Sequence, residues 1–285
     1  MTRTTTIDIA LPVLNEQRCL ERNVRDLKTR LPSGSGYHWS ISIVDNGSTD
    51  ASWEIAARIA QTEQNVRALR LGQRGRGRAL KAAWTSSTAD IVAYMDIDLS
   101  TDLAALGPLV DAIAEGGADI AIGSRLAPDS QVTRSVRREV ISHVYNLIAR
   151  GMLRYAVKDA QCGFKAVTRQ VAQTVVPNVE DNGWFFDTEL LALAWRRGLR
   201  IAELPVRWVE DDDSRVRIVN TALDDLRGIW RLVRHADDDG SSSVPDESLD
   251  VLESVTCADT LTDVIPSSSP SLTHRGADPA VDDRS

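Results

Sequence analysis

Two carboxylates, Asp96 and Asp98, lie one residue apart at the end of a short apolar run, Ile91–Asp96. The run is predicted to be a buried strand. Because side chains alternate along an extended chain, both carboxylates point to the same side. Paired carboxylate oxygens suit Mg²⁺ or Mn²⁺, and such an ion can neutralise a diphosphate leaving group as a Lewis acid. An Asp-x-Asp pair also occurs by chance in loops, but its place at a strand end favours a metal site.

A further acidic residue, Asp45, ends the apolar run Trp39–Asp45 and begins the segment DNGSTD. In a doubly wound sheet this position lies beside a nucleotide base or ribose. Asn46 and Gly47 supply a turn, and Ser48 can cap the next helix. A turn and a cap explain every residue of the segment except Asp45, which is the candidate for nucleotide binding.

The segment GQRGRGR at 72–78 alternates glycine with basic residues ahead of a predicted helix, Arg78–Ser86. Backbone N–H groups of such a loop, Gly77 among them, can hold phosphate at a helix N-terminus. A flexible basic loop explains the composition equally well. The segment is weak evidence for a dinucleotide site, which requires G-x-G-x-x-G directly after a strand.

A cluster of arginines follows the fifth predicted strand, at Arg125, Arg134, Arg137 and Arg138. Arginine binds phosphate bidentately. A phosphate monoester is mostly dianionic at pH 7, so as an acceptor it needs positioning but no general base. Arg125 is the preferred candidate, with Arg134 and Arg138 behind it, and a solvated helix face is the alternative. Farther along, Arg215 and Arg217 can reach a diphosphate.

Asp187 and Glu189 are the other prominent carboxylates of the chain. We expect Asp187 to cap the helix at Thr188–Arg196 and to orient groups of the site. A hydroxyl acceptor, unlike a phosphate, would need a base, and Asp187 is then the first candidate for that role.

The elements that position these residues alternate between strand and helix in the first half of the chain. The predicted strands are Thr6–Val13, Trp39–Asp45, Val66–Leu71, Ile91–Asp96 and Ala118–Ile122. The helix at Glu16–Arg30 is expected to be capped by Asn15. This alternation predicts an α/β fold, a doubly wound and mainly parallel sheet with its site at the carboxyl ends of the strands.

The second half of the chain departs from that alternation. Long helices are predicted at Val136–Leu153 and Ile218–Val233, and a shorter one at Phe186–Arg196. Strands are predicted at Phe164–Thr168 and, hinged at Pro205, at Arg200–Trp208. With no internal linker, residues 1–234 are predicted to form one domain.

The acidity of the chain is concentrated at its C-terminal end. The net charge is −8 over 285 residues, and His235–Ser285 holds twelve acidic and two basic residues. That segment has no aromatic residue and few aliphatic ones, so residues 235–285 are expected to be a disordered tail that catalysis does not need. Three separated cysteines indicate neither a disulfide framework nor a zinc site and fit a reducing cytosol. We expect no membrane span, no signal peptide and no nucleic-acid partner.

The motifs taken in order resemble the inverting family 2 glycosyltransferases with a GT-A fold. They are PVLNE, IVDNGSTD, the glycine loop, DIDLS, GSR, DAQCGFK, WFFDTELL and ELPVRW. Within that family the chain is similar to the polyprenyl (dolichyl) phosphate glycosyltransferases, and the glucosyl branch is favoured over the mannosyl branch. The resemblance covers about Ile7–Val233.

The resemblance implies a role for each matching residue. Asp96 and Asp98 would hold the metal and the sugar-diphosphate, and Arg125 would bind the acceptor phosphate. The nucleotide pocket would be lined by Pro12, Leu14, Glu16 and Asp45. The chain departs from the family at Leu14, where an aromatic residue is common, at Asn46, where a second Asp is usual, and at Ser100, where mannosyl relatives have Gln.

The sequence thus predicts a metal-dependent hexosyltransferase, with Mg²⁺ or Mn²⁺ as cofactor. It would transfer glucose, from a UDP-linked donor, to polyprenyl phosphate with inversion. The alternatives are a GDP-mannose-dependent enzyme, a transferase with a soluble hydroxyl acceptor, and a nucleotide-sugar-binding protein without turnover. A lipid acceptor implies a peripheral protein at the cytoplasmic face of a membrane. The candidate docking surfaces are the helices Val136–Met152 and Ile218–Val233, and packing of each helix against the sheet is the alternative. The sequence does not fix the oligomeric state.

Overall fold

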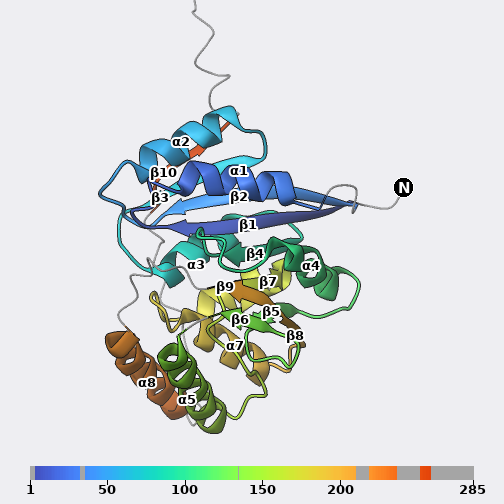
Figure 1. Cartoon of the computed structure of the whole chain (residues 1–285), viewed down its shortest axis with the longest axis vertical. Coiled ribbons are helices and arrows are strands. Elements are labelled where there is room, and N and C mark those ends of the chain that lie inside the picture. Colours follow the sequence, from blue (N-terminus) through green and yellow to red (C-terminus); the bar gives the residue numbers. More distant parts are fainter. Residues whose placement is uncertain (1–3, 33–35, 134, 210–217, 236–250, 258–285) are drawn as a thin grey trace, which may run out of the picture.

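An eight-stranded sheet forms the centre of the protein (Figure 1). The computed structural model describes residues 4–32, 36–133, 135–209, 218–235 and 251–257. The order across the sheet is β10-β3-β2-β1-β4-β7-β5-β8. The strands are β1 (Thr5–Val13), β2 (Tyr37–Asp45), β3 (Val66–Leu71), β4 (Ile91–Met95), β5 (Ile120–Ser124), β7 (Phe164–Thr168), β8 (Ile201–Pro205) and β10 (Val251–Thr256).

Most neighbouring strands of this sheet run parallel. β1 pairs in parallel with both β2 and β4, β2 with β3, and β5 with β8. The exceptions are β7, antiparallel between β4 and β5, and β10, antiparallel to β3. The predicted mainly parallel α/β fold is confirmed. A separate parallel pair, β6 (Gln131–Thr133) and β9 (Arg207–Val209), lies beyond the carboxyl end of β5.

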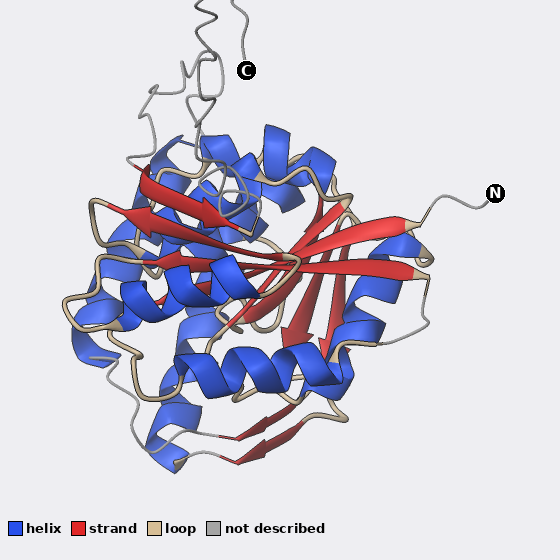
Figure 2. Cartoon of the chain, turned by 90° about the horizontal axis from the view of Figure 1, so that it is seen from above, coloured by secondary structure: helices blue, strands red, loops and turns tan. Residues whose placement is uncertain are grey.

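Helices cover both faces of the sheet (Figure 2). On β1 the side chains of Ile7 and Ile9 enter one hydrophobic core and that of Ala10 enters the other, because strand residues alternate. The first core is completed by α1 (Leu20–Arg30), α2 (Ser52–Thr62) and α4 (Leu106–Ala114). The second is completed by α3 (Arg76–Ser86), α5 (Val136–Leu153), α6 (Arg169–Thr174), α7 (Phe186–Arg196) and α8 (Ile218–His235). Two 3₁₀ turns, Leu103–Ala105 and Val176–Asn178, complete the elements.

The helices α5 and α8 contact each other at one end of the molecule (Figure 1). The bounds of α5 are those predicted from the sequence, but its apolar residues divide between two faces. Tyr145, Ala149 and Leu153 are buried, whereas Leu147 is 68% exposed. On α8, Ile229 and Leu232 are buried and Trp230 is 53% exposed. No helix among the described residues has the length and apolarity needed to cross a bilayer.

The predicted cap of the first helix is wrong. Asn15 has a left-handed backbone, with φ 58°, and α1 begins only at Leu20. The Asn15 side-chain oxygen instead accepts a 2.8 Å hydrogen bond from the Thr49 backbone N–H. Asn15 therefore ties the loop after β1 to the loop after β2, which brings two candidate nucleotide-binding segments together.

Part of the acidic tail is ordered, contrary to expectation. Val251–Thr256 forms β10 on the outer edge of β3. An edge strand has unpaired N–H and C=O groups, and pairing satisfies them without a hydrophobic core of the tail's own. Val255 adds an apolar contact, since it packs against the core beneath α2. The division at residue 234 remains a prediction.

Candidate active site

The carboxyl ends of β1, β2 and β4 meet at one edge of the sheet. Val13 pairs with Asp45 in register, and Asp96 follows the end of β4 at Met95. Pro12, Leu14 and Glu16 come from the end of β1 and are each partly exposed. The Glu16 backbone N–H donates to the Ser52 hydroxyl at 2.8 Å, which holds this turn against α2. The residues predicted to line the nucleotide pocket thus come from adjacent strand ends.

Asp45 lies at the predicted position but is fully buried. Its Oδ1 accepts a hydrogen bond from the Ser48 N–H, and its Oδ2 lies 3.6 Å from Arg70 Nε. Burial raises the pKa of the Asp45 carboxyl, while the Ser48 hydrogen bonds and Arg70 oppose the rise. Asp45 is therefore a buried acceptor beside one cation rather than an open surface carboxylate.

Asn46, which departs from the family, has a structural role. Its side-chain oxygen accepts a 2.7 Å hydrogen bond from the Gly75 N–H and so fixes the glycine loop. An aspartate would accept the same bond, so this substitution does not by itself argue against nucleotide binding.

Gly77 was predicted to hold phosphate through its backbone N–H, and in this structure that N–H has a protein partner. The Gly77 N–H donates to the Gly183 carbonyl at 3.1 Å, and the Arg78 N–H donates to the Asn182 carbonyl at 3.2 Å. These amides are already used. A β-carbon at position 77 would also lie 2.6 Å from the Phe186 β-carbon. Gly77 permits close packing of α3 on the segment before α7.

A charge network that is buried except at Asp96 joins the glycine loop, β4, β7 and α7. Arg76 donates through Nη2 to Asp96 at 2.5 Å and through Nη1 to Asp187 at 2.8 Å. Lys165 Nζ lies 2.8 Å from Asp187 Oδ1, and the Tyr94 hydroxyl donates to the same oxygen. Asp187 does not cap its helix, because the Phe186 N–H donates to Asp181 instead. The expectation that Asp187 orients site groups agrees with this network.

The two cations of the network differ in exposure. Lys165 is completely buried, and the Arg76 side chain is 10% exposed beneath the Trp184 ring, 4.7 Å from its centroid. Burial opposes the charge on Arg76, but Asp96, Tyr94 and Asp187 outweigh it and raise its pKa. Sequence reasoning missed Arg76, Lys165 and Tyr94. A lysine inside the apolar run Phe164–Thr168 was the available signal, since a buried lysine needs a partner.

Asp96 and Asp98 are the outward-facing carboxylates of the site. The Asp96 side chain is 44% exposed, and Asp98 is exposed with its Oδ1 accepting from the Ser100 N–H. Within the described part of the chain, no three His, Cys, Asp or Glu side chains gather as a metal site. Among the described residues, the site therefore offers two protein carboxylates as metal ligands, and further ligands would have to come from substrate or water.

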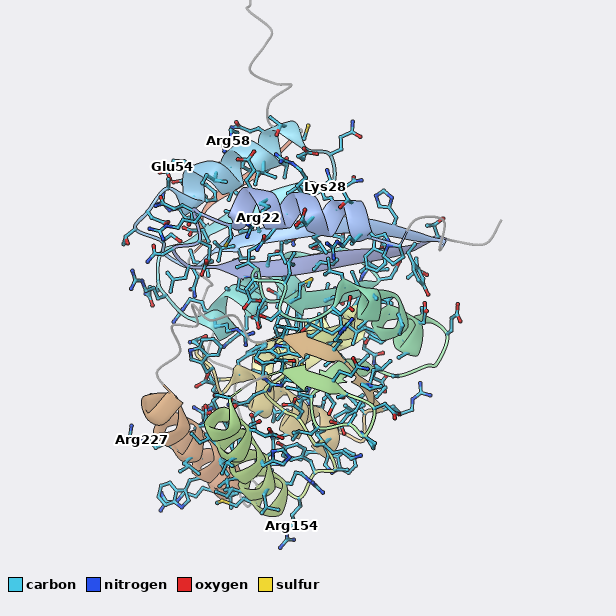
Figure 3. All side chains as sticks on the ribbon, viewed as in Figure 1. Arg22, Lys28, Glu54, Arg58, Arg154 and Arg227 are labelled. Carbon is cyan, nitrogen blue, oxygen red and sulfur yellow. The ribbon has the colours of Figure 1, made fainter. Side chains whose placement is uncertain are left out.

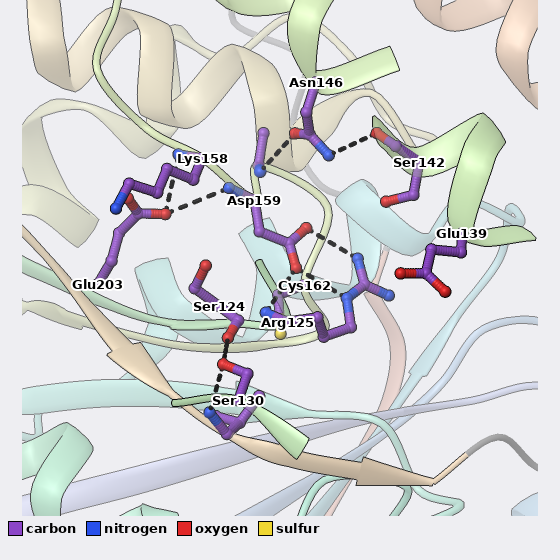
Figure 4. Close-up of polar contacts among 12 residues, drawn as sticks. Ser124, Arg125, Ser130, Glu139, Ser142, Asn146, Lys158, Asp159, Cys162 and Glu203 are labelled. Carbon is purple, nitrogen blue, oxygen red and sulfur yellow. Dashed lines mark hydrogen bonds and ion pairs between the residues drawn. The ribbon is translucent and has the colours of Figure 1, made fainter. Parts of the chain in front are cut away.

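Arg125 is held by a carboxylate that sequence reasoning did not single out, Asp159 of the DAQCGFK segment (Figure 4). Its Nε and Nη2 bind the two Asp159 oxygens at 2.8 and 2.9 Å. Asp159 is completely buried, and its loop is fixed by bonds from its own N–H to Glu203 and from the Ala160 N–H to Asn146. Burial would raise the pKa of Asp159, but Arg125 outweighs burial and lowers it. Arg125 is thus charged and oriented.

The structure leaves three predicted residues without a side-chain description. Arg134 and Arg215 lie outside the described residues, and Arg138 lies in α5 with its side chain outside them. Close to this helix, an open pocket of about 350 Å³ combines aliphatic and basic side chains. It is lined by Leu126, His143, Val144, Asn146, Leu147, Arg150 and Lys158.

Comparison with known proteins places this geometry among glycosyltransferases. The model of glycosyl transferase family 2 matches residues 8–176. Glycosyltransferase AglD of Haloferax volcanii is 37% identical over 235 residues, covering 79% of this chain and 37% of that protein. The dolichyl-phosphate beta-glucosyltransferases of Dictyostelium discoideum and Saccharomyces cerevisiae are each 27% identical. They cover 79% and 78% of this chain, and 73% and 71% of their own lengths.

Solved structures with the same GT-A fold include glucosyl-3-phosphoglycerate synthase from Mycobacterium tuberculosis. Its complex with uridine-diphosphate has a TM-score of 0.62 at 20% identity, covering 81% of this chain and 80% of that one. Its complex with Mn²⁺ and uridine-diphosphate-glucose has a TM-score of 0.60 at 18% identity, covering 80% and 79%. At this level of identity the likeness establishes the fold.

Proposed function

Because the chain belongs to glycosyl transferase family 2, we propose that it transfers glucose from a nucleotide-sugar to a polyprenyl phosphate, with inversion. The dolichyl-phosphate beta-glucosyltransferases support the acceptor class and the sugar, and UDP is the preferred donor nucleotide. One observation carries the choice of acceptor. Asp187, the carboxylate best placed to act as a base, already accepts contacts from Arg76, Lys165 and Tyr94.

A carboxylate whose oxygens already bind two cations and a hydroxyl has to give up contacts before it can reach the proton of an acceptor. A hydroxyl acceptor needs proton removal, whereas a phosphate dianion does not. Because both oxygens of Asp187 are already in contact with protein groups, the structure supports an acceptor that needs no base, such as a phosphate. We expect Asp187→Asn to lower kcat without removing an acidic limb, the fall at low pH that an essential base causes, from the pH profile of kcat/KM. A limb that disappears in this variant would favour a hydroxyl acceptor.

The donor end of the reaction needs charge neutralisation at the diphosphate. Asp96 and Asp98 offer hard oxygen ligands and are the exposed carboxylates of the site, so they fit Mg²⁺ or Mn²⁺. An ion held there would neutralise charge that develops on the leaving group. Arg76 binds Asp96 from the protein side and adds a permanent positive charge next to that position.

The acceptor end needs a cation of fixed orientation. Asp159 fixes Arg125 through Nε and Nη2, and Arg125 Nη1 makes no hydrogen bond to any residue that the structure describes. That nitrogen is available to donate to a phosphate oxygen. The pocket beside Leu126 supplies an apolar wall with basic side chains, Arg150 and Lys158, and suits the first units of a polyprenyl phosphate.

A lipid acceptor places the protein at a membrane surface, and the faces of α5 and α8 are suited to it. Val140, Val144 and Leu147 recur on one face of α5 and are each more than half exposed, as is Trp230 on α8. Arg154 and Arg227 project from the same end of the molecule, whereas Arg22 lies on α1 (Figure 3). Exposed apolar groups with basic residues favour binding at an anionic lipid surface. We propose peripheral binding at the cytoplasmic face.

The function is tested by incubating the full chain with a short-chain polyprenyl phosphate and labelled UDP-glucose, GDP-mannose or UDP-galactose. We expect label from UDP-glucose in the lipid extract when Mg²⁺ or Mn²⁺ is present. Label from GDP-mannose would favour the mannosyl alternative, and label only in water-soluble products would contradict a lipid acceptor.

Surface binding is tested separately by flotation with phosphatidylglycerol vesicles. Arg154→Asn is expected to reduce binding and Arg22→Asn to leave it unchanged. Equal binding by both variants and the parent would argue against this end of the molecule as the docking face.

A further inference from the structure

The strand β10 brings a charged residue of the acidic tail next to the nucleotide end of the site. Glu253 pairs in register with Arg70 of β3, while Arg70 pairs with Asp45 of β2. Side chains directly opposite each other on neighbouring strands lie on the same face of the sheet. Three charged residues from β10, β3 and β2 thus form a row that runs from the sheet edge to the buried carboxylate.

The distances show that Arg70 is shared between two carboxylates. Its Nη1 lies 3.5 Å from Glu253 Oε1, and its Nε lies 3.6 Å from Asp45 Oδ2. The guanidinium also lies over the Trp53 ring, 5.6 Å from the centroid. Glu253 is about half exposed, Arg70 about one-third exposed and Asp45 buried, so the row connects solvent to the interior.

Arg70 contributes to the charged form of Asp45 from within this row. Among the described residues its buried Oδ2 has no hydrogen-bond partner, and Arg70 is the cation that faces it. A buried carboxylate without a cation favours the neutral form. The Ser48 hydrogen bonds also favour the charged form of Asp45, whereas the nearby Asp50 opposes it, so Arg70 supplies the part of the stabilisation that comes from a cation.

We propose that Arg70 is a positioning residue of the donor site and that Glu253 of β10 fixes it there, so that the C-terminal strand forms part of the nucleotide-binding apparatus. The inference rests on the proposed function, which places the donor nucleotide at Asp45. Arg70 favours the charged form of Asp45 and orients it as an acceptor for an N–H or O–H group of the nucleoside. Glu253 holds the far side of the same guanidinium.

The expected loss of nucleotide affinity follows from how far each of the two Arg70 ion pairs is exposed to solvent. The contact between Glu253 and Arg70 is partly solvated, and such pairs change an equilibrium by no more than about fivefold. The contact of Arg70 with the buried Asp45 is better shielded, so its loss is expected to weaken nucleotide binding by about tenfold or more.

The test measures binding of UDP and of GDP, in Mg²⁺, to the full chain by isothermal titration calorimetry. Arg70→Gln should raise Kd by about tenfold and Glu253→Gln by about two- to fivefold. Ser254→Ala is the matched control on β10, because its side chain points to the opposite face. Glu253→Gln should have no further effect in the Arg70→Gln background. If Glu253→Gln raised Kd equally in the parent and in Arg70→Gln, Glu253 would not act through Arg70 and the inference would be overturned.

Two further measurements keep the inference distinct from the proposed function. Hydrogen exchange of the β3 amides shows whether β10 stays paired in Glu253→Gln; unchanged Kd with β10 paired would overturn the role of Glu253. If the parent chain binds neither nucleotide, the proposed donor is wrong. The role of Arg70 is then judged from a carboxyl ¹³C NMR titration of Asp45. Arg70→Gln should raise the pKa of Asp45, and an unchanged titration would overturn the inference.

Discussion

Arg76 Nη2 donates a 2.5 Å hydrogen bond to Asp96 Oδ1, so the first carboxylate of the Asp-x-Asp pair is already bound to a buried cation. A metal ion at Asp96 must share this carboxylate with the guanidinium. A metal ion and a guanidinium bound to the same carboxylate repel each other unless further anionic ligands surround them. The diphosphate of a donor supplies that anionic charge, so we expect metal and nucleotide to bind more tightly together than either does alone.

Gly163 makes this arrangement possible. A β-carbon at position 163 would lie 2.0 Å from Asp96 Oδ2. We expect Gly163→Ala to displace Asp96 from Arg76 and to reduce turnover at least a hundredfold. Gly151→Ala is the control, because a β-carbon at that position of α5 contacts nothing within 4 Å. Steady-state kinetics and thermal melts check the prediction, and a Gly163→Ala enzyme of normal kcat would contradict it.

Asp98 is the exposed member of the pair, and its loss should affect chemistry more than folding. We expect Asp98→Asn to abolish turnover in saturating Mg²⁺ or Mn²⁺, because one anionic metal ligand is removed. The melting temperature should change little. Asp102→Asn serves as the control, since asparagine keeps the oxygen that accepts from the Ala104 N–H. Near-normal turnover of Asp98→Asn would show that Asp98 is not a required metal ligand.

Arg125 has a structural role besides the acceptor-binding role that we propose for it, and one substitution cannot separate the two. Arg125→Ala leaves Asp159 buried without its cation, and losing one partner of a buried pair costs about 3–5 kcal/mol of stability. Arg125→Ala/Asp159→Ala should recover part of that loss. The acceptor KM should stay raised about ten- to a hundredfold in both, because a charge-assisted contact is worth about 1.5–3 kcal/mol. Denaturant unfolding and acceptor kinetics together check this prediction, which fails if KM recovers with stability.

Asp225 on α8 predicts how stability depends on pH. It is 2% exposed and accepts a hydrogen bond from Gln161, and burial raises its pKa to about 7. A carboxyl with a raised folded-state pKa binds its proton more tightly in the folded protein. Its contribution is therefore full below the unfolded pKa near 4 and is lost as the pH rises to about 7.

Asp225→Asn should remove this fall in stability between about pH 4 and 7, which amounts to at most about 4 kcal/mol. Urea unfolding at pH 5 and pH 8 measures it. Asp224→Asn, an exposed neighbour paired with Arg227, is the control and should keep the parent's pH dependence. A parallel pH dependence in Asp225→Asn and the parent would show that the group titrates normally.

Local sequence patterns predicted the helices and strands well, because the burial of one face of an element requires apolar residues at regular spacing within a short segment. The bounds of β7 and of the long helix α5 match the sequence prediction. The position of β7 did not follow from the same pattern. Its apolar run indicates a strand, but nothing in Phe164–Thr168 states that it inserts antiparallel between β4 and β5.

Candidate site residues could be predicted where a short local pattern identifies them. They could not be predicted where the role of a residue depends on a partner far away in the sequence. The spacing of Asp96 and Asp98 correctly placed them after the end of β4, and their role as metal ligands stays a prediction. Arg76 and Asp159 acquire their roles from residues 20 and 34 positions away, Asp96 and Arg125. Likewise Gly77 resembles a phosphate-binding residue until the carbonyls of 182 and 183 are seen to occupy the neighbouring amides.

The pairing of β10 with β3 also determines whether the protein exposes a free strand edge to other copies of the same chain. A chain that ended before Val251 would leave the outer edge of β3 unpaired over Val66–Leu71. A bare edge with unpaired backbone N–H and C=O groups is a template for a strand from a neighbouring molecule. The acidic segment thus protects the sheet from growing by self-association, and shortened versions of the protein should precipitate at concentrations where the full chain stays dispersed.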